Sequence, residues 1–314
     1  MRVYEFARNK DLKSKEVVAI CHELGIEVKA QSKLSDEQVV LLEGLLNQKL
    51  VASNIEQLNL LNEKVILTEN KIEPLKDGKY VGYVVSECEP FTKLGELGKK
   101  TAEFIEQTQK DGHVPVVILP KYGFIREEME CVVTVKIDQQ VASMWQMVKE
   151  GVTYLFLDNE FYFNRDKIYG YEDDVARFSF FNRGVLECLP LLKLQIDEFY
   201  LNDWHTSLFA LLLKVEYGHQ GYYRQVKTIL NIHNLDHQGW CEVDQLSDVL
   251  GVGEEYYYSG LMRMGECVNL LKSGIETADE ICLSRVSQLQ MKCSEMVASG
   301  MSAVLERNLK SKSG

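Results

Sequence analysis

The sequence has no long apolar run that could cross a membrane or direct the chain to secretion. Its most apolar segment, Ser207–Val215, contains Lys214 and is far shorter than the roughly 20 residues that a membrane helix needs. The chain opens with charged residues within Met1–Glu5 rather than with a basic cluster followed by an apolar segment, so no secretion signal is predicted. These absences predict a cytoplasmic protein without a membrane partner.

The sequence also lacks a CxxC motif, although it contains eight cysteines. Structural zinc sites bring Cys and His together at short spacing, so we expect no metal site. Most of the cysteines lie in apolar segments, which predicts reduced and buried thiols. They are Cys21, Cys88, Cys131, Cys188, Cys241, Cys267, Cys282 and Cys293.

The sequence also has no excess of basic over acidic side chains. The net charge of −12 argues against binding to the phosphates of a nucleic acid. The charge is uneven: residues 1–50 carry eight basic and eight acidic side chains and are neutral, whereas most of the negative charge lies in residues 79–314. We therefore expect no nucleic acid partner for either part of the chain.

Residues 1–50 predict a small helical module. In Arg2–Ala7 the side chains of Val3 and Glu5 alternate with those of Tyr4 and Phe6, which indicates a short strand or an extended turn. Ser14 can cap a helix that runs from Lys15 to about Leu24, with an apolar face at helical spacing.

A second helix start follows at Ser35 and Gln38, which have the spacing of a capping box. Apolar residues from Val39 to Leu46 then repeat at helical spacing. Residues 51–78 fit a helical linker, and the turn residues in Pro74–Gly78 mark a domain boundary.

From residue 79 to residue 314 apolar, β-branched runs alternate with helical segments, among them Val175–Leu192 and Thr206–Val215. Strands that alternate with helices predict an α/β fold, here a single Rossmann-like, doubly wound domain. The expected strands are Lys79–Ser86, Val114–Leu119, Cys131–Ile137, Val152–Leu157, Glu198–Leu201 and Lys227–Ile232.

A glycine-containing loop, Ser86–Gly98, links the first of these strands to a helix. Free amides and the positive end of a helix attract anions, and glycine lets the backbone approach them closely. The loop resembles the opening of glycogen and starch synthases, S-E-x-x-P-F-x-K-x-G-G-L-G-D, in which it holds the phosphates of ADP-glucose or UDP-glucose. The resemblance assigns this role to Lys93, Gly95, Glu96 and Gly98.

Two residues of this loop depart from that family pattern. Glu96 replaces the second glycine, and Lys99 stands at the position of the aspartate. Glu96 brings a negative charge to a helix start, where a carboxylate is favoured by roughly 0.3–1 kcal/mol. We therefore expect its carboxylate to occupy the anion site and to weaken the binding of a nucleotide sugar.

Further matches to the synthase family run in family order over residues 79–309. They are Leu119–Gly123, Phe156–Asn159, Tyr162–Arg165, Ile168–Gly170, Arg177–Arg183, Asn202–Thr206, Ile232–Gly239 and Asn269–Ile275. Asn202–Thr206 resembles the motif H-D-W-H-T, with Asn202 in place of the first histidine. The resemblance makes His205 a residual catalytic residue and assigns sugar binding to Asp203, His205, Asn234, Gln238 and Asn269.

This resemblance implies one half of a two-domain GT-B glycosyltransferase. In that family two Rossmann-like domains face each other, and the second supplies most of the nucleotide contacts. Residues 79–314 correspond to the first, acceptor-side domain, and the segment Cys282–Ser287 departs from the family's T-V-S-P-x-Y. We therefore expect a chain that lacks the second domain and is inactive on its own.

The N-terminal module has a resemblance of its own, to the N-terminal module of bacterial translation initiation factor two. It is carried by Arg2–Ala7, Ser14–Glu16, Leu24–Lys29 and Leu34–Glu37. The resemblance implies an element that docks on a protein partner. A helical cap without any partner is the alternative.

Three functions follow as hypotheses. The first is a non-catalytic relative of the synthases, an interaction or regulatory module that binds glucan or sugar. The second is the acceptor-side half of a split ADP-glucose or UDP-glucose glucosyltransferase that works with a partner chain. The third is an adapter that docks through residues 1–50. All three allow a homo-oligomer, and none requires a cofactor beyond ADP-glucose or an α-glucan as ligand.

Overall fold

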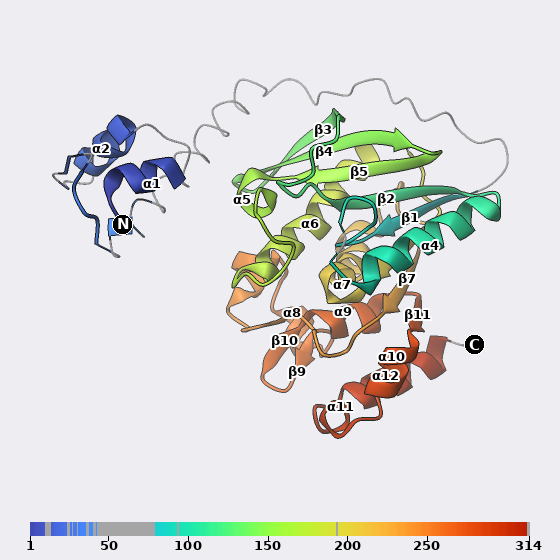
Figure 1. Ribbon diagram of the computed structural model, residues 1–314. Coiled ribbons are helices and arrows are strands. Elements are labelled where there is room, and N and C mark those ends of the chain that lie inside the picture. Colours follow the sequence, from blue (N-terminus) through green and yellow to red (C-terminus); the bar gives the residue numbers. More distant parts are fainter. Residues whose placement is uncertain are drawn as a thin grey trace. The chain divides into compact units, whose positions relative to one another are not determined.

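The computed structural model describes residues 1–9, 14–23, 26, 28–29, 31–35, 38–39, 42, 79–92, 94–192 and 194–312. The chain divides into two compact units (Figure 1): the first holds the described residues through Leu42 together with Asp138–Gln140, and the second holds the rest of the large sheet and its helices. The expected linker over residues 51–78, most of the helix expected from Val39 to Leu46, and Lys93 lie outside the described residues.

The first unit begins with helix α1, Val3–Asn9, where a strand or an extended turn was predicted. That prediction was wrong, because the apolar residues of this segment also recur at helical spacing. Val3, Phe6 and Ala7 lie three and four residues apart and are buried together in a small hydrophobic cluster. Tertiary packing of this apolar stripe decides the conformation.

Helix α2, Ser14–Glu23, confirms the helix predicted from Lys15 to about Leu24 and buries Val17 and Cys21 in the same cluster. The capping box is also confirmed. The Gln38 backbone N–H donates to Ser35 Oγ at 3.2 Å, and the Ser35 backbone N–H donates to Gln38 Oε1 at 3.0 Å. Both amides at this helix start are thereby satisfied by side chains.

The second unit is built on an eight-stranded sheet with the strand order β11-β7-β6-β1-β2-β5-β4-β3. The strands from β11 to β5 run parallel, and β4 pairs with β5 in the antiparallel sense. The predicted α/β, Rossmann-like fold is confirmed. The strands are β1 (Tyr80–Val84), β2 (Val114–Pro120), β3 (Glu130–Ile137), β4 (Gln140–Lys149), β5 (Val152–Asp158), β6 (Glu198–Asn202), β7 (Lys227–Ile232) and β11 (Glu280–Leu283).

Helices lie on both faces of this sheet (Figure 1). The helices of this unit are α4 (Glu96–Lys110), α5 (Glu160–Phe163), α6 (Asp174–Cys188), α7 (Asp203–Leu212), α8 (Glu255–Tyr258), α9 (Leu270–Thr277), α10 (Arg285–Gln290), α11 (Ser294–Ala298) and α12 (Met301–Lys312). A smaller antiparallel sheet holds β8 (Trp240–Cys241), β10 (Cys267–Asn269) and β9 (Arg263–Met264). Within the described residues, no helix is both long and apolar enough to span a membrane.

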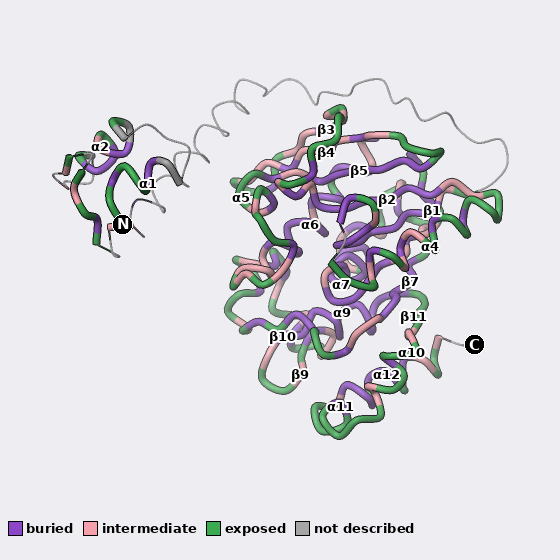
Figure 2. The backbone as a smooth tube through the Cα atoms, viewed as in Figure 1, coloured by how far each residue is buried: buried purple, intermediate pink, exposed green. Residues whose placement is uncertain are grey.

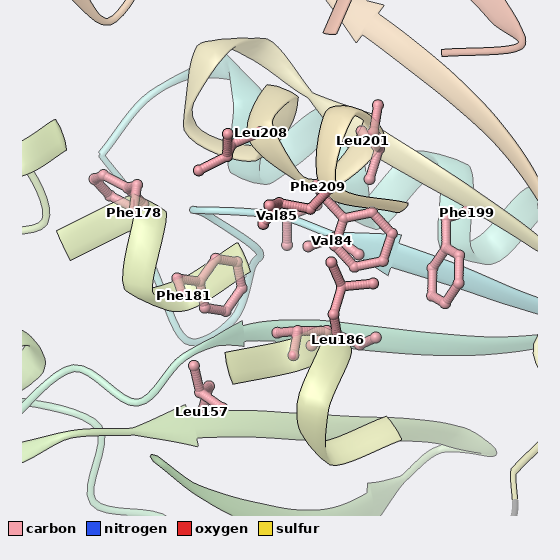
Figure 3. Close-up of a cluster of buried hydrophobic side chains, with 14 of the residues drawn as sticks. Val84, Val85, Leu157, Phe178, Phe181, Leu186, Phe199, Leu201, Leu208 and Phe209 are labelled. Carbon is pink, nitrogen blue, oxygen red and sulfur yellow. The ribbon is translucent and has the colours of Figure 1, made fainter. Parts of the chain in front are cut away.

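The core lies between the sheet and helices α6 and α7, and burial is continuous through the parallel strands (Figure 2). Figure 3 shows how aromatic and aliphatic side chains of both helices meet those of the strands. The labelled residues are Val84, Val85, Leu157, Phe178, Phe181, Leu186, Phe199, Leu201, Leu208 and Phe209. This packing fixes α6 and α7 against the sheet, and both helices carry residues of the candidate site.

Parallel pairing brings the carboxyl ends of β1, β6 and β7 to one edge of the sheet. In the register, Val84 pairs with Leu201 and Asn202 pairs with Asn231, so the segments that follow these strands are neighbours. Ligands of open α/β sheets bind at this edge. The motifs found in the sequence therefore converge there.

Candidate functional site

The segment after β1 is organised by a buried carboxylate, Glu87, which is only 4% exposed. Its Oε2 accepts from the Gly95 backbone N–H at 3.1 Å, and its Oε1 accepts from the Tyr169 hydroxyl at 2.9 Å. The same hydroxyl lies 2.6 Å from Ser86 Oγ. Sequence reasoning missed this arrangement, because no local pattern connects Glu87 with a residue 82 positions away.

Helix α4 starts directly after this segment, with Gly95 as its N-cap and no side chain capping it. Glu96, the first helical residue, is exposed, and the carboxylate that reaches the Gly95 amide is that of Glu87. Lys99 is exposed one turn further along the helix. Gly98 is buried, and a Cβ there would lie 2.9 Å from the Thr92 carbonyl oxygen, so glycine is required.

The turn from β6 into α7 is formed by Asp203, whose φ of 54° lies in the left-handed region. Its Oδ1 accepts from the backbone N–H groups of His233 and Asn234 at 2.7 and 3.3 Å. Burial raises the pKa of Asp203 to about 7, although the two amide bonds act in the opposite direction. This carboxyl therefore joins the end of β6 to the segment after β7.

His205 lies two residues further on and is surrounded by aromatic rings. Ring centroids of Tyr169, Phe178 and Trp204 lie 4.6, 4.6 and 4.2 Å from that of its imidazole. Burial lowers the pKa of His205 to about 3, so the ring is neutral at physiological pH. Its Nδ1 is buried and has no hydrogen-bond partner among the described residues.

Asn202, at the position of the family's first histidine, pairs with His233, which directly follows β7. Its Oδ1 lies 2.9 Å from His233 Nε2. Burial lowers the pKa of His233 to about 4, and the positive charge of Lys100 acts in the same direction. The Asn202–His233 pair thus adds a side-chain link beside the backbone bonds made by Asp203.

The other residues expected to bind sugar make their hydrogen bonds inside the protein. Asn234 Oδ1 accepts from Gln290 Nε2 at 2.7 Å. Gln238 Oε1 accepts from Asn269 Nδ2 at 2.7 Å, and both side chains are buried. Asn269 Oδ1 also caps α9 by accepting from the Lys272 N–H at 2.8 Å. The fold therefore brings Asp203, His205 and Asn234 to one edge, while Gln238 and Asn269 form a buried pair.

A cavity of about 370 Å³ opens beside the segment after β1. One wall comes from that segment, and the other comes from the residues between α5 and α6 together with Phe124, which follows β2. The lining residues are Phe91, Thr92, Leu94, Phe124, Asp166, Lys167, Ile168 and Tyr169. Of these, Leu94 and Phe124 are 66% and 41% exposed. The sequence patterns did not identify this cavity, because its lining residues come from segments that are far apart in the chain.

The second wall is held in place by Arg177 of α6, whose side chain is fully buried. Its Nε donates to the Tyr162 carbonyl at 2.8 Å, and its Nη1 donates to the Ile168 carbonyl at 3.0 Å. Asp174 neutralises the guanidinium charge through an ion pair. A helix packed into the core thereby fixes the backbone at both ends of a lining segment.

The described residues contain no group of three or more His, Cys, Asp and Glu that could hold a metal ion. The cysteines are free, and four of them are buried: Cys21, Cys88, Cys188 and Cys241. Cys282 and Cys293, by contrast, are exposed. The chemistry that the site offers is therefore hydrogen bonding and stacking around a cavity, beside one neutral histidine.

Comparison with known proteins agrees with this geometry. Residues 80–307 match the family model "Starch synthase catalytic domain", and residues 1–47 match "Translation initiation factor IF-2, N-terminal region". The glycogen synthases of Bacillus subtilis and Anoxybacillus flavithermus are each 38% identical to the chain, over 63% and 62% of its length. These matches cover 43% and 42% of the two relatives, so the chain spans less than half of their length.

Among solved structures, the catalytic domain of starch synthase IV from Arabidopsis thaliana, bound to ADP and acarbose, superposes with a TM-score of 0.67. It is 25% identical, and the superposition covers 74% of this chain and 50% of that one. The second unit thus has the Rossmann-like architecture of a GT-B glycosyltransferase domain. Because the family model spans most of the sequence, the chain belongs to the starch synthase catalytic domain family.

Proposed function

We propose that the second unit binds an α-glucan in the cavity beside β1 and acts as a non-catalytic interaction or regulatory module. The observation that carries this proposal is the lining of the cavity. The aromatic residues Phe91, Phe124 and Tyr169 lie next to the polar side chains of Thr92, Asp166 and Lys167. Sites for small molecules combine apolar walls with a few polar groups in this way, and the volume of about 370 Å³ suits one or two sugar rings.

The start of α4 supports the view that the unit does not transfer glucose. A nucleotide sugar needs free amides and positive charge where its diphosphate binds. Here Glu96 places a carboxylate at the first helical residue, where the family pattern has a glycine. Glu87 belongs to the family pattern, whereas Glu96 and Lys99 depart from it. The substitutions therefore disfavour the donor, while the cavity for a neutral ligand remains.

The ligand class is proposed by similarity. The Arabidopsis starch synthase IV domain binds acarbose, a glucan-like oligosaccharide, together with ADP. We expect maltooligosaccharides to bind this chain, and we expect ADP and ADP-glucose to bind it weakly. Thermal unfolding in the presence of each ligand measures this directly. A ligand at about 100 times its dissociation constant adds roughly 2.7 kcal/mol of stability.

Two results would contradict the proposal. One is a larger thermal shift with ADP-glucose than with maltoheptaose. The other is sustained transfer of glucose from ADP-glucose or UDP-glucose to glycogen by the chain alone. The transfer assay needs the Bacillus subtilis glycogen synthase beside it as a positive control.

Phe124→Ala tests the cavity itself. We expect it to weaken the binding of maltoheptaose by about tenfold, because removal of one stacking aromatic ring costs on the order of 1–1.5 kcal/mol. The matched control is Phe104→Ala, since Phe104 is 45% exposed on α4 and does not line the cavity. Isothermal titration calorimetry compares the two. Equal affinities for both variants would place the glucan elsewhere.

A split glucosyltransferase is the second candidate. The observation in its favour is the retained turn at β6, where Asp203 and His205 stand at the matching positions of the family motif and His205 is neutral. A partner chain would then supply the donor-binding part. Adding the part of the Bacillus subtilis glycogen synthase that this chain does not match should restore transfer from ADP-glucose. Failure of that mixture, with the intact synthase active, counts against the split enzyme.

An adapter role rests on the match of residues 1–47 to the N-terminal region of translation initiation factor IF-2. We propose that this unit docks on a protein partner while the second unit binds glucan, and that the chain can self-associate. The test compares partners captured from a lysate by the full chain and by a variant without residues 1–47. Light scattering measures the oligomeric state. Identical sets of captured partners would remove the adapter hypothesis.

A further inference from the structure

The two walls of the cavity are far apart in the sequence, and one buried side chain bonds to both. Glu87 Oε2 accepts from the Gly95 N–H, which adjoins the lining residue Leu94. Glu87 Oε1 accepts from the hydroxyl of Tyr169, which lines the opposite wall. Glu87 itself does not line the cavity.

The surroundings of Glu87 make these two bonds strong. The side chain is 4% exposed, so its bonds are little weakened by competition with water. The Tyr169 ring also packs against His205, with 4.6 Å between ring centroids. Any shift of Tyr169 therefore changes both the cavity and the imidazole.

The close approach of α4 to this segment supports the same arrangement. A Cβ at Gly98 would lie 3.6 Å from the Glu87 Cβ and only 2.9 Å from the Thr92 carbonyl oxygen. The Glu89 backbone N–H donates to the Gly98 carbonyl at 3.2 Å. The start of α4 is thus held against the strand end that carries Glu87. The opposite wall is farther away, and the long side chain of Glu87 reaches it through the Tyr169 hydroxyl.

We propose that Glu87 is a positioning residue that fixes the distance between the two walls and thereby sets the affinity for glucan, which it does not touch. This inference rests on the proposed function of the cavity. The role depends on the reach of the side chain and not on its charge. A glutamine has the same reach: its oxygen can accept from Gly95, and its amide can donate to the Tyr169 oxygen while that hydroxyl donates to Ser86.

The experiment compares Glu87→Gln, Glu87→Ala and the control Glu89→Ala in the full chain. Glu89 is half-buried in the same segment and does not line the cavity. Calorimetry gives the affinity for maltoheptaose, and NMR gives the hydrogen exchange rate of the Gly95 amide without ligand. For Glu87→Ala we expect affinity to fall and exchange to rise by about tenfold each, since a lost bond to a carboxylate is worth roughly that factor. Glu87→Gln should stay within about threefold of the unsubstituted chain in both.

Each outcome decides the inference. It is overturned if Glu87→Ala binds maltoheptaose like the unsubstituted chain, or if Glu87→Gln is as weak as Glu87→Ala, which would indicate a charge effect. If the unsubstituted chain binds no maltoheptaose, the proposed function fails, and the exchange of the Gly95 amide still tests the link made by Glu87. Should Glu87→Ala not fold, Tyr169→Phe keeps the ring and removes the hydroxyl. Unchanged affinity in that variant would also contradict the inference.

Discussion

At the scale of single residues, three titratable side chains at the carboxyl edge of the sheet have unusual pKa values: Asp203, His205 and His233. Burial lowers the pKa of His205 to about 3 and that of His233 to about 4, from 6.5. Between these values and pH 6.5 the unfolded chain binds two more protons than the folded chain. Their contribution to stability is therefore present above pH 6.5 and is lost as the pH falls.

Asp203 acts in the opposite direction, because its pKa is raised from 3.8 to about 7. Between these values the folded chain holds a proton that the unfolded chain has lost, so stability falls as the pH rises. Two histidines outweigh one aspartate below pH 6.5, and Asp203 acts alone between pH 6.5 and 7. We expect the free energy of unfolding to be greatest near pH 6.5.

The substitution Asp203→Asn tests this balance. It keeps an oxygen for the His233 and Asn234 amides and removes the titration. We expect the rise in stability between about pH 4.5 and 6.5 to become steeper by about 1.4 kcal/mol per pH unit, and the decline above pH 6.5 to disappear. Urea unfolding at several pH values measures both slopes. Unchanged slopes would mean that Asp203 is ionised throughout this range.

At the scale of elements, the segment after β7 depends on a glycine that packs against the start of α7. Gly239 has a φ of 65°, and a Cβ there would lie 2.4 Å from a ring carbon of Trp204, the neighbour of His205. We expect Gly239→Ala to cost about 2–4 kcal/mol of stability, because backbone strain and a collision add together. It should also weaken the binding of maltoheptaose by displacing the aromatic rings around His205.

Gly265→Ala is the matched control, because its φ of 62° is similar and a Cβ there would meet nothing within 4 Å. It should cost only the strain, on the order of 1 kcal/mol. Urea unfolding of both variants separates the two contributions. Equal losses would show that Trp204 moves aside without cost.

The sequence predicted six of the eight strands of the large sheet, including the partly buried β3, and missed β4 and β11. The parallel strands β1, β2 and β5 were found because they are continuous apolar runs. Strand β4 was missed, because only alternate residues such as Ala142 and Met144 are buried. The site was predicted in part for a similar reason. Motifs locate residues along the chain, whereas the bonds of Glu87 and Arg177 join segments that only the fold brings together.

At the scale of the whole molecule, the two units have separate hydrophobic clusters. One contains Val3, Phe6 and Leu42, the other spans the large sheet, and they have no residue in common. Segments unfold cooperatively when they share a hydrophobic core, and these two units do not share one. We therefore expect removal of residues 1–47 to leave the urea midpoint of the second unit unchanged within about 0.3 M. Tryptophan fluorescence reports on that unit, since the three tryptophans, Trp145, Trp204 and Trp240, all lie in it. A lower midpoint would mean that the first unit stabilises the second.

The contrast between buried and exposed cysteines makes the chain suitable for selective labelling. Burial raises the pKa of Cys88 and Cys241 to about 12, so their thiols stay protonated and unreactive at neutral pH. Cys293 is exposed and directly precedes α11, and Cys282 is exposed on β11. A maleimide dye should therefore attach at these two positions first. Changing Cys282, Cys131 and Cys267 to serine would leave Cys293 as the one thiol outside the buried class, and a fluorophore there can report ligand binding without altering the cavity.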